Sequence, residues 1–342
     1  MKKSGKAEIS PMTVIFLMFI LVFTTLIVFA VNVVSYRPQK AEEMTGPSDD
    51  GRYNFLVLGK DKVASLTDII LLFSIDTENH EAFILQIPRD TYLDYTDKNY
   101  KKINGALAAY GDEKVLSEKL SEYFSLTIDH YVSLDIEAFE NIVDMLGGVE
   151  VNVPADMDYD DPEQGLSVHI KSGRQTLDGK SAMGFVRYRK GYLMGDIARI
   201  DAQKIFAAAL AEKIMNEKNP MTLYNILVNV KKEVKTDICD RDVLYFAYNF
   251  LLCPENKIFI ATLPGESERS EISGAWYYII SRQGCAELLS ERFGLECGEK
   301  DFDKNENFVD TETKSFYDIY NKFYGYRLYR VDEIGRNGIE LT

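Results

Sequence analysis

The sequence predicts an α/β domain, a layered α-β-α sheet core flanked by helices, preceded by one transmembrane helix. Short apolar runs that end at turn residues, such as 53–58 and 69–75, are typical of buried strands. Longer stretches whose apolar residues recur with helical spacing, such as 136–146, follow them along the chain. Because strands that alternate with helices usually build one covered sheet, these two patterns predict the layered domain.

The N-terminal segment 12–34 carries no charge over 23 residues, which is enough to cross a bilayer with some tilt. Three lysines precede this segment, and that bias favours an N-terminus inside the cell. A cleaved signal peptide is the alternative, but its apolar core would be shorter and would end at a small-residue cleavage site. We therefore expect an uncleaved anchor in the cell membrane, with residues 1–11 in the cytoplasm and the remaining chain extracytoplasmic.

Downstream of this anchor the sequence divides into three parts. Residues 35–51 are rich in proline, glycine and acids, which is typical of a polar linker. We expect an extracytoplasmic folded domain over 52–298 and, over 299–342, a C-terminal appendage of unknown role. The expected strands are 53–58, 69–75, 82–87, 149–153 and 257–262, and the expected helices are 116–124, 136–146, 198–210, 222–232 and 240–252.

Turn residues place the ends of several of these elements. Gly59 follows the first apolar run, and Pro88 closes the third. The pair Gly147-Gly148 is a natural stop for the helix before it. Alternating valines from Val149 then predict a half-exposed strand, which Pro154 ends.

The net charge of −15 restricts the classes of partner. Proteins that bind duplex nucleic acid or anionic lipid surfaces usually have a strongly basic face, and this acidic chain shows no such excess of basic residues. Any anion that the protein binds must therefore be met by a local cluster of cations.

The four cysteines allow three disulfide pairings in an oxidising compartment. They are Cys239, Cys253, Cys285 and Cys297. Each also suits a buried apolar position, and no C-x-x-C pair or neighbouring histidine suggests zinc. The choice between bridges and free thiols stays open.

A cluster of arginines stands out against the acidic background. What we call the arginine cluster comprises Arg89, Arg187, Arg189 and Arg199, together with Gln203. The planar fork of a guanidinium matches phosphate oxygens bidentately, so the cluster predicts a phosphate-ester site. The Arg-x-Arg pair points one way only if residues 184–189 are extended, and taken alone it would be ordinary surface arginine. Lys102 adds a further cation.

Two aspartates, Asp61 and Asp68, flank one loop between two expected strands. Their carboxylates can therefore converge at one sheet edge, where they suit Mg²⁺ or Mn²⁺ held together with substrate phosphate. The alternative is that Asp61 caps a turn and Asp68 begins a strand, which turn preferences alone favour. Asp90, next to Arg89, is a candidate base.

Nine short motifs resemble the LytR-CpsA-Psr family in order and spacing, most densely between residues 52 and 215. They lie at 55–61, 67–68, 87–90, 102–104, 128–131, 146–149, 175–179, 186–189 and 199–203. A later family element resembles residues 263–266.

The resemblance implies a membrane-anchored phosphotransferase of bacterial cell-wall assembly. Such an enzyme moves a glycopolymer, for example teichoic acid or capsular polysaccharide, from polyprenyl pyrophosphate to peptidoglycan, and holds the lipid in an apolar groove. The resemblance implies that Asp61 and Asp68 bind the metal and that the arginine cluster grips the pyrophosphate. The expected catalytic residues are Asp68, Arg89, Arg187 and Arg189.

This chain departs from the family pattern at a few positions. Ala202 stands where an arginine often precedes the glutamine, and Ile69 replaces a frequent threonine. Substrate preference and rate are what these changes affect. Two alternatives therefore stay open, namely a non-catalytic wall-binding or regulatory protein and a pyrophosphate hydrolase of lipid-linked glycans.

Overall fold

The computed structural model describes residues 51–60, 66–93, 101–161, 166–188, 196–217, 219–293, 314–337 and 339. All of them belong to one compact unit, Lys40–Thr342. The expected anchor 12–34 and nearly all of the expected linker 35–51 lie outside these ranges. No helix within the described ranges has the length and apolarity needed to cross a bilayer.

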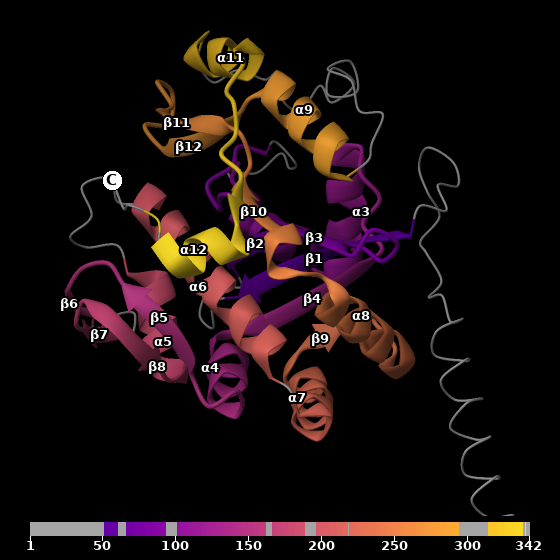
Figure 1. Ribbon diagram of the computed structural model, residues 1–342. Coiled ribbons are helices and arrows are strands. Elements are labelled where there is room, and N and C mark those ends of the chain that lie inside the picture. The colour runs from indigo at the N-terminus through magenta and orange to yellow at the C-terminus, as the bar shows by residue number, and fades with distance from the viewer. Residues whose placement is uncertain are drawn as a thin grey trace, which may run out of the picture. The chain divides into compact units, whose positions relative to one another are not determined.

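A mixed seven-stranded sheet forms the centre of the unit (Figure 1). Its parallel pairs are β1 with β4 and β3 with β10, and the other neighbours run antiparallel. In spatial order the strands are β13 (Tyr329–Arg330), β10 (Ile258–Thr262), β3 (Glu81–Gln86), β2 (Thr67–Asp76), β1 (Arg52–Lys60), β4 (His130–Asp135) and β9 (Lys235–Thr236).

Helices and three small hairpin sheets surround this sheet. The helices are η1 (Ile103–Gly105), α2 (Ala106–Tyr110), α3 (Glu113–Phe124), α4 (Ile136–Met145), α5 (Gly179–Arg187), α6 (Asp196–Asn216), α7 (Pro220–Glu233), α8 (Asp240–Leu252), η2 (Glu255–Lys257), α9 (Arg282–Phe293), α11 (Lys314–Asn321) and α12 (Val331–Asn337). The paired strands are β5 (Val149–Val153) with β8 (Gly173–Leu177), β6 (Met157–Asp161) with β7 (Leu166–Ile170), and β11 (Gly265–Arg269) with β12 (Trp276–Ile280).

Helices cover both faces of the sheet. Alternate residues of each strand point to opposite faces, so the central strands present apolar side chains to the helices on both sides. On one face Leu56 and Leu72 join a buried core with α3 and α9. On the other face the Phe55 ring packs edge-on against Phe246 of α8, with ring centroids 4.8 Å apart. Helix α6 lies over the rest of that face and contacts β10. The expected sheet core flanked by helices is therefore present.

Most expected elements correspond to observed ones. The expected strands match β1, β2, β3, β5 and β10, and the expected helices match α3, α4, α6, α7 and α8. Capping residues explain several helix starts: Asp112 accepts hydrogen bonds from the backbone of α3, and Asp178 does so for α5. The structure differs at residues 184–187, which are the last residues of α5 rather than an extended segment. Buried side chains such as Ala182 and Val186 hold this helix in place.

The described part of the C-terminal region, 314–337, is built into the same unit. Helix α11 packs against the β11–β12 hairpin and buries Phe316 and Ile319 in the core. Strand β13 pairs with β10, and α12 contacts α6. The structure therefore joins these residues to the domain expected to end at 298.

The described cysteines are free thiols. Cys239 is exposed, whereas Cys253 and Cys285 are buried. Burial raises the pKa of Cys253 to about 12, which keeps this thiol protonated and unreactive at neutral pH. Cys297 lies outside the described residues.

Adjacent residues of α11 provide a test of this packing. Phe316 is 3% exposed, and its neighbour Tyr317 is 51% exposed. We expect Phe316→Ala to lower the free energy of unfolding by about 3–5 kcal/mol, since it removes a buried ring. Tyr317→Ala is the matched control and should change it by less than about 1 kcal/mol. Equal small effects in urea unfolding would show that α11 is not part of the core.

Candidate functional site

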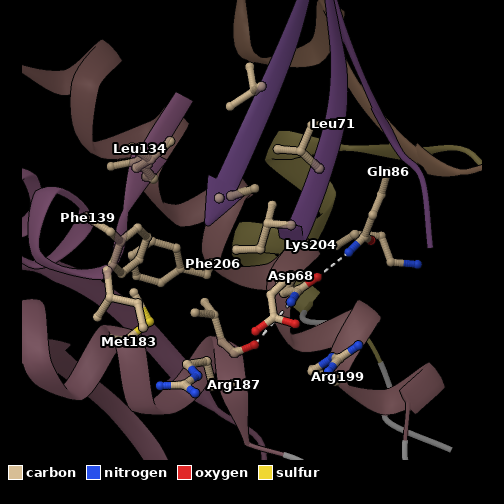
Figure 2. A pocket seen from close by; sticks show the side chains of 18 of the residues that line it. Asp68, Leu71, Gln86, Leu134, Phe139, Met183, Arg187, Arg199, Lys204 and Phe206 are labelled. Atoms are coloured by element: carbon tan, nitrogen blue, oxygen red, sulfur yellow. Dashed lines mark hydrogen bonds between the residues drawn. The ribbon is translucent and has the colours of Figure 1, made fainter. Parts of the chain in front are cut away.

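A cavity of about 420 Å³ lies on the α6 side of the sheet, between the strands and helices α4, α5 and α6. Its apolar lining includes Leu71, Leu134, Phe139, Met183, Phe206 and Ile260. Its polar lining includes Lys60, Asp68, Gln86, Arg187, Arg199 and Lys204. Figure 2 shows Leu134, Phe139 and Phe206 in the upper left of this space, and Asp68, Arg187 and Arg199 below them toward its lower edge. The cavity therefore has one apolar part and one charged part.

Asp68 owes its direction to a β-bulge between β1 and β2. Gly59 pairs with Ile69 and Lys60 pairs with Thr67, which leaves Asp68 as the extra residue. A bulge breaks the alternation of side chains and turns one of them to a new face. Thr67 consequently points away and donates to the Asn104 carbonyl, while Asp68 and Ile69 both line the cavity.

Arg89 pairs with Asp68 because of the β2–β3 register. Leu71 lies opposite Gln86 in this antiparallel pair, so Asp68, three residues earlier, meets Arg89, three residues later. Arg89 Nη1 lies 2.6 Å from Asp68 Oδ1, and both side chains are largely buried. The sequence predicts a strand end before Arg89, but this pairing was not predicted. The predicted convergence of Asp61 with Asp68 stays a prediction, because Asp61 lies outside the described residues.

Two helices bring Arg187 and Arg199 of the predicted arginine cluster to the cavity that Asp68 lines. Arg187 is the last residue of α5, and Arg199 lies in the first turn of α6. Arg199 is almost fully buried, and both residues line the cavity with Asp68 (Figure 2). Residues more than a hundred positions apart thus meet at one place, and their role in binding phosphate stays a prediction.

Gln203 lies one turn after Arg199 and is held by two protein groups. Its side-chain carbonyl accepts a hydrogen bond from Gln86 of β3, and its Nε2 donates to the Val186 carbonyl at 3.1 Å. Val186 directly precedes Arg187, so this chain of amides fixes the end of α5 that presents that arginine. Gln86 was given no role from the sequence; its only signal is a polar residue within an apolar run.

Lys204 is a second residue that sequence reasoning missed. This buried lysine lines the cavity, and its Nζ lies 2.7 Å from Asp201 and 4.9 Å from the ring centroid of Tyr329 in β13. The C-terminal region therefore contributes to the surroundings of a cavity cation.

Lys102 lies outside the cavity lining and reaches the site through Asp90. Lys102 Nζ is 2.8 Å from Asp90 Oδ1, and Asp90 Oδ2 is 4.0 Å from Arg89 Nε. Asp90 is thus placed between two cations. Asp61 and Arg189 lie outside the described residues; Lys60, which precedes Asp61, lines the cavity.

Oxygen ligands in the cavity suit a hard cation such as Mg²⁺. No three His, Cys, Asp or Glu side chains within the described ranges form a group that could hold a metal. Mg²⁺ is, however, commonly held by one or two carboxylates together with substrate phosphates and waters. Since Oδ1 of Asp68 pairs with Arg89, Oδ2 is the oxygen left for a metal. The residues present fit a metal that takes most of its ligands from the substrate.

The LytR_cpsA_psr family model matches residues 22–293, which is most of the chain. The chain belongs to this family. The resemblance seen in the nine sequence motifs is thereby confirmed. The match ends with α9, so α11, β13 and α12 of this family member lie beyond it.

Named relatives of this family member include a transferase and a regulator. The polyisoprenyl-teichoic acid–peptidoglycan teichoic acid transferase TagU of Oceanobacillus iheyensis is 30% identical over 252 residues, which cover 70% of this chain and 75% of TagU. The regulatory protein MsrR of Staphylococcus aureus is 28% identical over 240 residues, which cover 68% of this chain and 71% of MsrR.

Solved structures share the fold. The crystal structure of Bacillus subtilis TagV is similar with a TM-score of 0.62 and 22% identity, covering 75% of this chain and 99% of TagV. TagT bound to LIIa-WTA is similar with a TM-score of 0.59 and 22% identity, covering 76% of this chain and 98% of TagT. This likeness confirms the mixed α/β fold of the LytR_cpsA_psr domain.

Glu113 does not line the cavity itself but pairs with Lys60, which does. Its Oε1 lies 3.4 Å from Lys60 Nζ, and Lys235 donates to its other oxygen. Burial alone raises the pKa of Glu113, but the hydrogen bond from Lys235 and the charges of Lys235 and Lys60 outweigh burial, so the pKa is lowered.

This lowered pKa makes a prediction for stability. A carboxyl whose pKa is lower in the folded state stabilises the fold above its unfolded pKa, about 4.3, and loses that contribution as the pH falls through the folded value. Glu113→Gln should therefore be less stable than the parent at neutral pH, with the two converging as the pH falls below about 4.3. Urea unfolding across pH measures this; Glu118→Gln, exposed on the same helix, is the control and should run parallel to the parent.

Proposed function

We propose that this LytR_cpsA_psr protein is a phosphotransferase that moves a glycopolymer, such as teichoic acid or capsular polysaccharide, from polyprenyl pyrophosphate to peptidoglycan. The observation that carries the proposal is one cavity with an apolar part and a part lined by Asp68, Arg187 and Arg199. An isoprenoid chain and a pyrophosphate need these two environments side by side. The relative TagU, named as a teichoic acid transferase, supports it.

The residues of the charged part act by binding and orientation. Arg187 and Arg199 approach from two helices, so their forks hold the pyrophosphate from two directions and offset the charge that develops on the leaving phosphate. A peptidoglycan hydroxyl bonds to the glycan-linked phosphorus, the bond to polyprenyl phosphate breaks, and Asp90 is the candidate acceptor for the hydroxyl proton. The apolar lining around Phe139 and Phe206 excludes water, which would compete as acceptor.

A divalent cation, Mg²⁺ or Mn²⁺, belongs to this proposal. When bound, it neutralises pyrophosphate charge. Asp68 supplies a ligand oxygen from the cavity wall, and Arg89 holds that carboxylate in place. Asp61 is the second proposed ligand, by the family resemblance.

We also propose that residues 12–34 anchor the protein in the cell membrane as a single transmembrane helix, with the α/β domain outside. The donor is itself embedded in that membrane through its lipid. When the enzyme and the donor are held in the same membrane, they meet by diffusion in two dimensions rather than three. This raises the effective concentration of the donor around the enzyme.

The test of this function is an assay of product release. Full-length protein in detergent is given a lipid-linked glycopolymer and peptidoglycan, and polyprenyl phosphate and polymer-bound peptidoglycan are both measured, with and without Mg²⁺. We expect Asp68→Ala to lose about 100-fold or more of the rate and most of the response to Mg²⁺. The exposed surface change Asp158→Asn is the control and should keep both.

Release of polyprenyl phosphate that does not depend on peptidoglycan would identify a hydrolase instead. A full Mg²⁺ response in Asp68→Ala would remove the metal role of this residue while leaving transfer intact. The two outcomes therefore test different parts of the proposal.

The shape of the guanidinium gives a second prediction. Arg187→Lys keeps the charge and loses the bidentate fork. We expect kcat/KM for the lipid-linked donor to fall about 10- to 100-fold, since a charge-assisted hydrogen bond contributes about 1.5–3 kcal/mol. The matched control is Lys180→Arg, an exposed cation change in the same helix, which should leave kcat/KM unchanged. If kcat/KM of Arg187→Lys equals that of Lys180→Arg, Arg187 acts only as a point charge.

A regulatory protein that binds lipid-linked glycans without turning them over is the second candidate. The relative named as regulatory protein MsrR and the alanine at position 202 favour it. Binding of the donor with no release of polyprenyl phosphate, at any Mg²⁺ concentration, would establish this candidate.

A further inference from the structure

Helices α7 and α8 expose two apolar stripes that the proposed chemistry does not use. On α7 the stripe is Met221, Tyr224 and Val228, spaced three and four residues apart, and Met221 is 65% exposed. On α8 it is Leu244, Tyr248, Leu251 and Leu252. The helices are joined by an ion pair from Lys231 near the end of α7 to Asp240 at the start of α8, and Figure 1 shows both on one side of the domain. We call these seven residues the α7–α8 surface.

The charges around the α7–α8 surface are unusual for this chain. Charged residues make up 27% of the sequence, yet residues 220–230 and 243–254 contain none. A domain with a net charge of −15 is repelled by an anionic surface. The acids that flank this surface, Glu233 and Asp240, are paired with Asn141 and Lys231. The seven residues themselves carry no charge, so apolar burial rather than charge must provide the attraction to a membrane.

The chain enters the domain beside α8. The Gly51 carbonyl accepts hydrogen bonds from Thr77 N at 3.0 Å and Thr77 Oγ1 at 2.8 Å, and Thr77 Oγ1 accepts one from Tyr245 of α8 at 3.3 Å. The ring of Tyr53 packs on Phe246 of the same helix. Residue 51, at which the expected linker ends, therefore lies beside α8.

We infer that the α7–α8 surface docks on the membrane that the protein's own anchor crosses, at the boundary between headgroups and acyl chains. The inference rests on the proposed anchoring. Tyr224 and Tyr248 are suited to this boundary, where an apolar ring and a polar hydroxyl find separate partners. Lys232 is exposed in the last turn of α7, and its long stem allows its charge to reach the headgroups. Weak docking is sufficient, because the anchor keeps the local concentration of lipid high.

Docking sets the position of the cavity relative to the lipid. Helix α7 begins directly after α6, which carries Arg199 and Lys204, and α7 also contacts α4. Both α4 and α6 line the cavity. A domain fixed through α7 and α8 would therefore present its cavity at a constant distance from the membrane.

Fluorescence quenching tests the inference, because the chain contains a single tryptophan, Trp276. Full-length protein with Trp276→Phe is combined with Tyr224→Trp or Tyr248→Trp and reconstituted into phosphatidylcholine vesicles whose acyl chains are brominated. The control is Tyr317→Trp in the same background, since Tyr317 and Tyr224 are both 51% exposed and α11 lies at the opposite end of the view in Figure 1. We expect about half of the emission to be lost at positions 224 and 248, since an interfacial side chain lies about 5–10 Å into the boundary, and little at position 317.

Equal quenching at all three positions, or none, overturns the inference. Emission at 224 that changes with the protein-to-lipid ratio, without quenching by brominated lipid, would show that a second copy of the chain covers this surface and also overturns it. Flotation of the same vesicles separates the two proposals: protein that fails to float contradicts anchoring, whereas protein that floats with unquenched emission contradicts docking alone.

Discussion

The irregular pairing of β1 with β2 is the constraint on which the charged part of the cavity depends. In a regular pair Asp68 would point toward α3, where the side chains are apolar. One extra residue in β2 turns it to the α6 side, and the β2–β3 register then brings Arg89 to the same place. The sheet can therefore keep one face for the core and use the end of the other face for charge.

Helices α5 and α6 provide the arginines that line the charged part of the cavity. Arg187 and Arg199 follow β4, the preceding strand of the central sheet, by more than fifty residues. The hydrogen bonds from Gln86 to Gln203 and on to Val186 connect strand and helices. These amide hydrogen bonds stabilise one arrangement of β3, α6 and the end of α5. The backbone that carries Arg187 is thus held in place by the protein itself, which fits the role proposed for this arginine in stabilising a transition state.

The sequence predicted the apolar parts of this fold better than the polar parts. Strands β1, β2 and β3 and helices such as α4 have clear periodicity, and the placement of Asp68 and Arg89 at strand ends followed from these apolar runs. Strand β4 was missed because its six residues show neither a long apolar run nor a regular alternation. The β6–β7 hairpin was missed because its aspartates are typical of a solvated loop. The bulge at Asp68 and the roles of Gln86 and Lys204 depend on contacts between distant segments, which no local pattern records.

The position of β13 has a consequence for folding of the domain. This strand of two residues forms the outer edge of the sheet next to β10, although more than sixty residues separate the two strands along the chain. The outer side of β10 therefore stays unpaired until residues beyond the LytR_cpsA_psr match have folded back onto it. An unpaired edge can capture a strand from a neighbouring chain, so β13 protects this edge against aggregation.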